Sequence, residues 1–428
     1  MQFTEALAEL EGRVPERMVP DLSRITALAG LLDNPQLTYP TIHVTGTNGK
    51  TTTSRLVTAL ACAHGLTTGL YTSPHLLSVT ERIAVCADPI SEDEFAEEYE
   101  RLVPYLAAVD EKGERVTYFE TLTALAYVWF SDKPVALGVF EVGMGGTWDA
   151  TNLIAGDVAV VCPVALDHPE LGATVAEVAT EKAGIIKPGK TAVCREQPPE
   201  ALRIIEDRCA EYETRLLLEG RDFALADCRP AVGGQFLSVR GLHATYDGLT
   251  LSLFGEHAAR NATTAIVALE AFLERALSVD LVRKALARAS SPGRLEVVAR
   301  HPMVILDGAH NPAGAQALAQ ALAESFAWDR LYLVMGVSAN KDLDGIVAEL
   351  APLADRAYAA RSSSVRSGEP SRIAGALVAA GVATEECGSV GEALASARAN
   401  AAEGDLILVT GSLYTVADAR RALGDPRR

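Results

Sequence analysis

Short apolar runs alternate with longer stretches of helical periodicity in the first part of this chain. The runs at residues 41–44, 135–141 and 158–161 are rich in β-branched side chains. Continuous apolar runs with helices between them are typical of a parallel sheet that helices cover on both faces. We therefore predict an α/β domain, and we expect ligands at the edge where its strands end.

The pattern changes between about residues 190 and 254. Apolar stretches at 216–218, 236–239 and 249–253 are separated there by Gly and Asp turns, which predicts an antiparallel addition to the same domain. A helix is expected from about Glu256, and a Ser-Pro-Gly sequence at 291–293 then interrupts the helical pattern.

A second strand–helix alternation follows this interruption. Strands are expected at 303–306, 331–335, 356–359 and 405–409, and an Ala-rich helix at 313–323. We place the domain boundary near Pro292, so that residues 1–290 form a nucleotide-binding domain and residues 291–428 a Rossmann-like α/β domain.

A Gly-rich turn joins the first apolar run to the following helix, with the sequence TGTNGKTT at residues 45–52. Such a turn points backbone N–H groups and a helix N-terminus at a phosphate. Lys50 would reach the β- and γ-phosphates, and Thr51 would hold Mg²⁺. The alternative is a turn that only connects two elements, but it gives no reason for a lysine here. The predicted nucleotide-binding residues of this loop are Gly46, Thr47, Asn48, Gly49, Lys50, Thr51 and Thr52.

Composition narrows the choice of partners. The chain is 49% apolar and 22% charged, and it has no apolar run long enough to cross a bilayer. Its net charge of −18 argues against nucleic acid and membrane partners, which require a basic face. No signal peptide is apparent, so we expect a cytoplasmic protein. The seven cysteines form no C-x-x-C pair, and we expect reduced, mostly structural thiols.

The motifs that follow the loop resemble those of one family of ATP-dependent amide ligases. The shortened phosphate loop resembles that of the Mur ligases and of the folylpolyglutamate synthase/dihydrofolate synthase family. The second branch is indicated by YTSPHL at 71–76, ERI at 81–83, TYFE at 117–120, EVGMGG at 141–146 and DATN at 149–152. The resemblance implies a Mur ligase-like fold and a monomer that adds L-glutamate to a reduced folate with ATP and Mg²⁺. It leaves open whether dihydropteroate is also accepted.

Activation of a carboxylate by ATP brings several anions together, so cations must offset their repulsion. Thr51, Glu141 at a strand end and His168 after the next strand are candidate metal ligands, and the resemblance adds Ser73. The alternatives are a surface carboxylate for Glu141 and a structural histidine for His168. On residue chemistry alone Lys182 is a helix lysine; the resemblance implies that it is carbamylated, which requires a neutral amine. The predicted catalytic residues are Lys50, Lys182 and His168.

Further nucleotide-binding candidates are His257, Asn261, Arg294, Asp307 and His310. His257 and Asn261 are four residues apart on a predicted helix and could meet the adenine together, although polarity of the helix surface is an alternative. Arg294 has forked donors that suit phosphate oxygens. By resemblance, Asp307 and His310 face the ribose or a phosphate.

The acceptor site is predicted around a flat pterin. The resemblance and the aromatic side chain of Phe119 suggest this pocket, although an aromatic residue beside apolar helices is also typical of a core. The predicted substrate-binding residues are Ser73, Pro74, His75, Leu76, Arg82, Phe119 and Asp149. Thr147, where the family often has arginine, and a short loop after His168 depart from the pattern and bear on substrate preference.

Three other functions agree with parts of the sequence. A Mur ligase for UDP-sugar peptides would need a further N-terminal domain, and only about 40 residues precede the loop. A nucleotide-dependent switch would have no use for Arg294, Asp307 and His310. A degenerate paralogue would bind folate or nucleotide without turnover, and Thr147 is its only hint.

Overall fold

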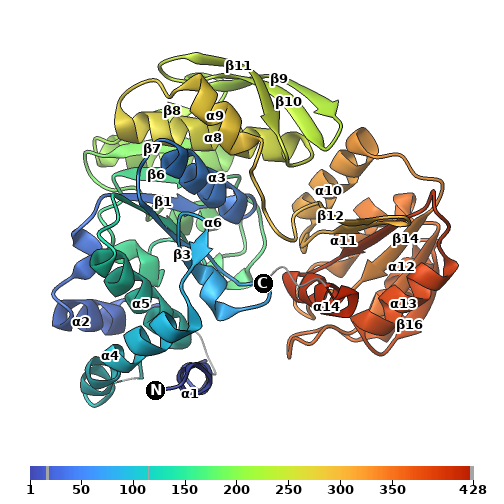
Figure 1. The fold of residues 1–428 in the computed structure, drawn as a ribbon, viewed down its shortest axis with the longest axis horizontal. Coiled ribbons are helices and arrows are strands. Elements are labelled where there is room, and N and C mark those ends of the chain that lie inside the picture. The colour runs from blue at the N-terminus through green and yellow to red at the C-terminus, as the bar shows by residue number, and fades with distance from the viewer. Residues whose placement is uncertain (16–18, 114, 425–428) are drawn as a thin grey trace. The chain divides into compact units, whose positions relative to one another are not determined.

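The computed structural model describes residues 1–15, 19–113 and 115–424 (Figure 1). Its internal contacts divide the chain into two compact units. The first unit comprises Met1–Asp227, Leu237–Thr250 and Arg260–Ala289, and the second comprises Cys228–Phe236, Leu251–Ala259 and Ser290–Arg428.

The first unit is built on an eight-stranded mixed sheet. In sheet order its strands are β4 (Asp88–Pro89), β3 (Ile83–Val85), β2 (Thr68–Tyr71), β5 (Leu137–Glu141), β1 (Thr41–Thr45), β6 (Val158–Val161), β7 (Thr191–Cys194) and β8 (Arg215–Leu218). The strands from β2 to β8 pair in parallel, which confirms the predicted α/β class, whereas β3 and β4 add an antiparallel edge. Because the strands from β2 to β8 are parallel, their carboxyl ends all lie on the same side of the sheet.

Helices surround this sheet. The α3 helix (Lys50–Ala63) packs on β1, β2 and β5, and α6 (Val175–Ala183) packs against α7 (Pro199–Glu211). Four further helices contact one another, and the last of them also contacts β2: α1 (Phe3–Glu11), α2 (Ser23–Leu31), α4 (Glu92–Asp110) and α5 (Tyr118–Asp132). Short 3₁₀ turns are η1 (Pro35–Leu37), η2 (Val79–Arg82), η3 (Ala150–Leu153) and η4 (Pro169–Leu171).

The core between α5 and the sheet is aromatic. Four aromatic rings surround the ring of Phe140 on β5, and their centroids lie 5.5–6.4 Å from its centroid. These rings belong to Tyr39, Tyr71, Tyr127 and Phe130. These rings are buried. Burial of such large apolar side chains fixes α5 against the strands, and therefore fixes the residues at its N-terminus.

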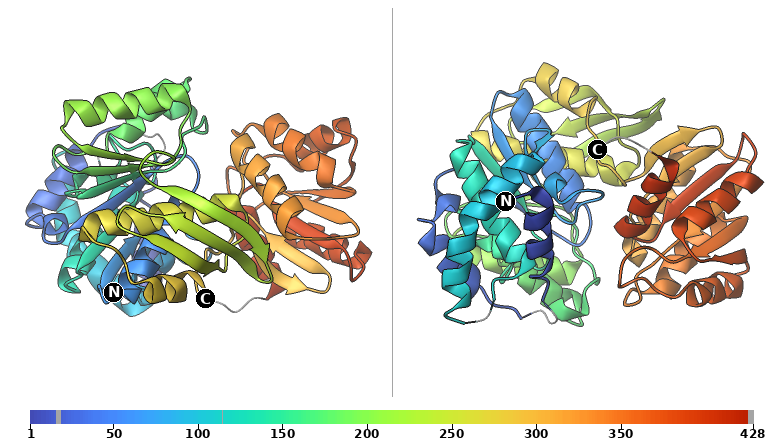
Figure 2. Two further views of the ribbon diagram at one scale, coloured as in Figure 1. Left: turned by 90° about the horizontal axis from the view of Figure 1, so that it is seen from above. Right: turned by 60° about the horizontal axis from the view of Figure 1, so that its bottom comes forward.

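One sequence expectation about the first unit is wrong. The stretch at 216–218 is not part of an antiparallel addition, because β8 pairs in parallel with β7 at the sheet edge. A separate three-stranded sheet follows, formed by β11 (Thr245–Leu251), β10 (Gly234–Arg240) and β9 (Ala224–Ala231), which Figure 2 shows as long neighbouring arrows. Two helices come next, α8 (Glu256–Leu273) and α9 (Val279–Leu286).

The second unit is a smaller α/β fold around a six-stranded sheet. Its strand order is β12 (Glu296–Arg300), β13 (Met303–Leu306), β17 (Leu406–Thr410), β14 (Leu331–Met335), β15 (Arg356–Ala360) and β16 (Ala383–Cys387). All pairs are parallel except β12 with β13. Its helices are α10 (Pro312–Ser325), α11 (Leu343–Leu350), α12 (Pro370–Ala379), α13 (Val390–Asn400) and α14 (Leu413–Leu423), with a 3₁₀ turn η5 (Ala351–Leu353). The predicted Rossmann-like class is confirmed.

Two further observations bear on the sequence expectations. Cys62 at the end of α3 and Cys86 after β3 form a disulfide, so the expectation of reduced thiols is wrong for this pair. The other five cysteines are not in disulfides. In the described part of the chain, no helix is both long enough and apolar enough to span a bilayer.

Candidate active site

The phosphate loop requires glycine at two positions. Gly46 has φ +141°, and a Cβ there would lie 2.5 Å from the Cβ of Cys162. Gly49 has φ +88°, and a Cβ there would lie 2.8 Å from the amide oxygen of Asn261. Side chains at these positions would therefore meet both backbone strain and a clash. The loop is pressed closely against the strand end at Cys162 and against α8.

Hydrogen bonds anchor the same loop to the segment after β6. The Thr47 N–H donates to Pro163 O at 2.8 Å, and the Thr47 hydroxyl donates to Ala165 O at 2.8 Å. Ala165 N–H in turn donates to the Thr47 hydroxyl at 2.9 Å. Because its middle is held in this way, the loop presents a fixed turn to the N-terminus of α3, as anion binding by backbone N–H groups requires.

Glu141 gathers two of the other predicted metal ligands. It is the last residue of β5 and pairs in register with Val44, directly before the loop. The Thr51 hydroxyl donates to one Glu141 carboxylate oxygen at 2.7 Å, and the Ser73 N–H donates to the other at 3.2 Å. Glu141 is 1% exposed. The structure thus brings Thr51, Ser73 and Glu141 together at the strand ends.

Two lysines meet at the carbonyl oxygen of Gly46. Lys50 Nζ donates to it at 2.9 Å and to Thr47 O at 3.2 Å, and Lys182 Nζ, from the last turn of α6, donates to it at 2.8 Å. Lys182 is buried, and burial together with the nearby charge of Lys50 lowers its pKa to about 7. A large part of its amine is therefore neutral near neutral pH.

His168 lies at the start of η4 and is more open than the lysines. Its side chain is 36% exposed, and its Nε2 lies 3.2 Å from a carboxylate oxygen of Asp167, whose side chain is 7% exposed. Within residues 1–15, 19–113 and 115–424, no cluster of three or more His, Cys, Asp and Glu side chains could hold a metal ion. A metal site here would rest on few protein ligands, as is usual for Mg²⁺, which keeps several waters and binds substrate phosphates.

The predicted acceptor loop contains a buried arginine, Arg82. Arg82 is 8% exposed; its Nε donates to His75 Nδ1 at 2.9 Å, and its guanidinium lies 5.4 Å from the centre of the Tyr118 ring. The Glu81 carboxylate accepts the N–H groups of Leu76, Leu77 and Ser78 at 2.7–2.9 Å. The Ser73–Pro74 bond is cis. The hydrogen bonds of Glu81 and Arg82 hold the segment between Ser73 and Arg82 in one conformation.

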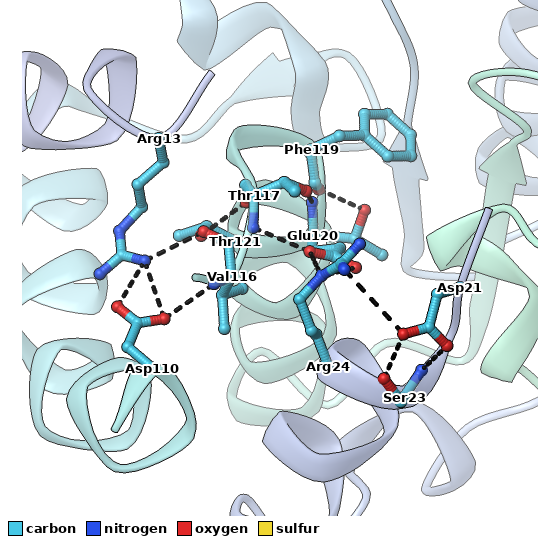
Figure 3. A network of polar contacts seen from close by, with 11 residues as sticks. Arg13, Asp21, Ser23, Arg24, Asp110, Val116, Thr117, Phe119, Glu120 and Thr121 are labelled. Carbon is cyan, nitrogen blue, oxygen red and sulfur yellow. Dashed lines mark hydrogen bonds and ion pairs between the residues drawn. The ribbon is translucent and has the colours of Figure 1, made fainter. Parts of the chain in front are cut away.

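Phe119 reaches the glycine-rich turn after β5. A Cβ at Gly143 would lie 2.5 Å from its ring, and the ring also lies beside Tyr71. Figure 3 shows the network that holds the start of α5, where Arg24 of α2 points at Glu120 and Arg13 meets Asp110 beside Val116. Glu120 also accepts the Thr117 N–H at 2.8 Å, which caps the helix.

Asp149 serves its own loop. Its carboxylate accepts from the N–H groups of Met144 and Thr151 at 2.9 and 3.0 Å, and from the Thr151 hydroxyl at 2.5 Å. Burial raises its pKa. The same hydroxyl lies 2.8 Å from Nε2 of the buried His43 on β1. These contacts tie the turn after β5 to the centre of the sheet.

Sequence reasoning missed two residues beside the phosphate loop, Arg195 and Glu219. They directly follow β7 and β8, and both are buried. Arg195 Nη1 donates to the Asn261 amide oxygen at 2.7 Å, while its Nε donates to Glu219 at 2.9 Å. If a strand had been predicted at 191–194, Arg195 would have been recognised as a candidate, because it directly follows the end of that strand.

Four of the predicted residues belong to the second unit. Arg294, Asp307 and His310 lie around the turn between β13 and α10, and His257 lies at the start of α8 beside Gly255. The buried Asp307 carboxylate accepts the N–H groups of Leu295 and Ala309 at 2.7 and 2.8 Å, and burial raises its pKa although the charge of Arg294 lowers it. His310 Nδ1 lies 2.8 Å from Gly308 O.

The class of protein follows from two features, a phosphate loop on a mixed α/β sheet and a second α/β unit, and from the family models that match both stretches of the chain. The model of the Mur ligase middle domain matches residues 44–269, and that of the Mur ligase glutamate ligase domain matches residues 293–413.

Individual relatives narrow this class. The dihydrofolate synthase/folylpolyglutamate synthase of Mycobacterium tuberculosis is 43% identical over 377 residues, covering 83% of this chain and 77% of that protein. Its counterpart in Bacillus subtilis is 30% identical and covers 98% of this chain and 99% of that protein. This chain therefore belongs to the folylpolyglutamate synthase/dihydrofolate synthase family.

Solved structures are similar over the same range. Mycobacterium tuberculosis folylpolyglutamate synthase complexed with ADP has a TM-score of 0.96 at 38% identity, covering 100% of this chain and 99% of that chain. Escherichia coli FolC in complex with DHPP and ADP has a TM-score of 0.89 at 31% identity, covering 100% and 99%.

Proposed function

We propose that this chain, an ATP-dependent ligase of the family named above, forms its amide bond through an acyl phosphate. A carboxylate oxygen of the folate would attack the γ-phosphorus of ATP, and the bond to ADP would break. The glutamate nitrogen would then attack the acyl carbon and lose its proton, and phosphate would leave with the electron pair. The observation that carries this proposal is the meeting of Thr51, Glu141, Lys50 and Lys182 at the phosphate loop.

The residues at Glu141 fit a magnesium ion. A hydroxyl and a buried carboxylate are hard oxygen ligands, and one or two such ligands suffice when phosphates and waters complete the octahedron. We propose that Thr51 and Glu141 hold the ion, with Ser73 and His168 as further candidates. When bound, Mg²⁺ would offset charge on the phosphates; Lys50 would add a fixed positive charge on the transferring group.

We propose that Lys182 is carbamylated. Its neutral Nζ would attack the carbon of CO₂, forming an N–C bond while one C=O π bond becomes a C–O⁻ group, and one proton would leave to solvent, which converts the neutral amine into an anion. The support is a buried amine whose pKa is lowered to about 7, beside a second lysine. A carbamate there would reverse the repulsion with Lys50 and provide another oxygen ligand.

The proposed binding residues for the acceptor substrate, and the further ones for ATP, rest on the motifs of the family. We propose that the loop from Ser73 to Arg82, including Pro74, His75 and Leu76, binds a reduced folate or dihydropteroate, with Phe119 against the pterin and Asp149 supporting the adjacent turn. We also propose that six residues contact ATP: Asn48, Asn261, His257, Arg294, Asp307 and His310. We propose a monomer in the cytoplasm, with L-glutamate as the second substrate.

Phosphate release tests this function. We expect release and glutamylated product only when ATP, L-glutamate and either dihydropteroate or tetrahydrofolate are all present. Lys50→Ala should lower turnover by roughly 100-fold or more while leaving the circular dichroism spectrum unchanged, because charge stabilisation is lost. Lys190→Ala, which removes a partly exposed lysine paired with Asp157 at 2.7 Å, is the matched control and should retain activity. A well-folded Lys50→Ala chain with normal turnover would contradict the proposal.

A further inference from the structure

The side chain of Asn261 is oriented by a residue behind it. Arg195 is 4% exposed and donates from Nη1 to the Asn261 amide oxygen at 2.7 Å. An arginine guanidinium carries only hydrogen-bond donors, whereas an asparagine amide has one acceptor and one donor end. The end that faces Arg195 must therefore be the oxygen. This contact commits Oδ1 and leaves Nδ2 as the donor of the amide.

The amide lies at the phosphate loop. A Cβ on Gly49 would lie 2.8 Å from Oδ1 and 3.3 Å from Nδ2 of Asn261, so both ends are close to the residue that precedes α3. The Asn261 side chain is itself buried. A ligand held by this loop would come within reach of the amide, and the donor end would select an acceptor on that ligand.

Arg195 is in turn held from the opposite side. Its Nε donates to Glu219 at 2.9 Å, and the other Glu219 oxygen accepts from Arg260 Nε at 2.8 Å. Arg260 also pairs with Glu196 at 2.7 Å. The Glu219 carboxylate keeps a cationic partner if Arg195 is replaced, so loss of Arg195 does not leave a buried charge alone.

We propose that Arg195 is a positioning residue that turns the Asn261 amide so that its Nδ2 donates to an acceptor of the bound nucleotide. The acceptor is a phosphate oxygen or a ring nitrogen of the base. This inference rests on the proposed nucleotide binding at the loop, and it adds a determinant of nucleotide affinity that lies outside the loop and its metal ligands.

Calorimetric titration of the full chain with ATP tests the proposal, together with KM and kcat. Arg195→Met should weaken ATP binding and raise the KM for ATP by about tenfold, the worth of one well-placed hydrogen bond, with kcat at saturating ATP nearly unchanged. Arg195→Lys should bind ATP more tightly than Arg195→Met does, but more weakly than the unchanged chain. Arg260→Met is the matched control, because Arg260 shares Glu219 but no hydrogen bond joins it to the Asn261 side chain; it should bind ATP as the unchanged chain does.

A double variant separates positioning from general stability. If Arg195 acts through Asn261, then Arg195→Met in the Asn261→Ala background should cause no further loss. Asn261→Asp keeps an oxygen for Arg195 but removes the donor, so it should also weaken ATP binding. Additive losses in the double variant, or equal losses in Arg260→Met, would overturn the proposal.

An ATP analogue with carbon in place of base nitrogen 7 distinguishes the acceptors. If that nitrogen accepts the bond, the unchanged chain should bind the analogue about tenfold more weakly than ATP, with no further loss in Arg195→Met. If a phosphate oxygen accepts it, the unchanged chain should bind both nucleotides alike and the variant should bind both more weakly. An unchanged chain that binds no ATP would instead contradict the proposed function itself.

Discussion

Burial changes what one lysine can do. Lys182 has a pKa lowered to about 7 from 10.5, mainly because it is buried. Between these two values the unfolded chain carries this proton and the folded chain largely does not. The free energy of unfolding therefore rises with pH through this window as far as Lys182 determines it, and the cost of burying the ammonium is greatest below pH 7.

The proposed carbamate makes this residue sensitive to carbon dioxide. Activity should fall in buffer stripped of CO₂ and bicarbonate and return when bicarbonate is added, with a larger response above pH 7 than below it, because only the neutral amine reacts. Lys182→Ala should be partly rescued by a short carboxylic acid. Full activity without CO₂, with no carbamate signal in the NMR spectrum after labelled bicarbonate is added, would contradict the proposal.

At the scale of single residues, the sequence predicted which side chains carry chemistry better than it predicted which residues contact one another. The strand-end rule placed Glu141 correctly at the end of β5, but no pattern indicates that its two oxygens meet Thr51 and Ser73, which come from different parts of the chain. Asp149 was predicted from a motif, whereas its bonds within its own loop depend on the turn geometry. The partnership of Cys62 with Cys86 likewise depends on how α3 meets β3.

The start of α5 depends on one buried ion pair. The Arg24 Nε lies 3.1 Å from both Glu120 oxygens, and the two side chains are 9% and 6% exposed. We predict that Arg24→Met lowers the free energy of unfolding by about 3 kcal/mol, because a buried carboxylate loses its partner. It should also raise the KM for folate, since Tyr118 and Phe119 begin this helix.

Arg101→Met provides the control in denaturant titration. Arg101 pairs with Glu98 and Asp132, but its side chain is 57% exposed, so we expect a loss below about 1 kcal/mol. Equal effects of the two substitutions would show that the Arg24–Glu120 pair does not hold the helix.

Strands with continuous, strongly apolar runs were predictable, and two more weakly apolar strands, β7 and β8, were not. The runs that became β1, β6, β13 and β14 are continuous and buried. β7 has the sequence TAVC, with Val193 as its one β-branched apolar side chain, and β8 has partly exposed residues, so neither showed the pattern of a buried parallel strand. Because β7 was missed, Arg195 could not be recognised as a strand-end residue beside the loop.

At the scale of the whole molecule, two α/β units carry separate groups of candidate residues. The first has the phosphate loop, Glu141 and Lys182, and the second has Arg294, Asp307 and His310. The family models match one stretch in each unit, residues 44–269 and 293–413. Family membership makes a nucleotide switch without chemistry a poor description of this chain.

Transfer of oxygen from the acceptor carboxylate to phosphate tests the central claim most directly. A folate whose terminal carboxylate carries heavy oxygen at both positions should be incubated with the chain, ATP, Mg²⁺ and L-glutamate, and the phosphate analysed by mass spectrometry. An acyl phosphate predicts that one heavy oxygen appears in the phosphate for each amide bond formed, since the attacking oxygen leaves with the phosphorus. Phosphate free of the label, alongside normal amide formation, would contradict the account.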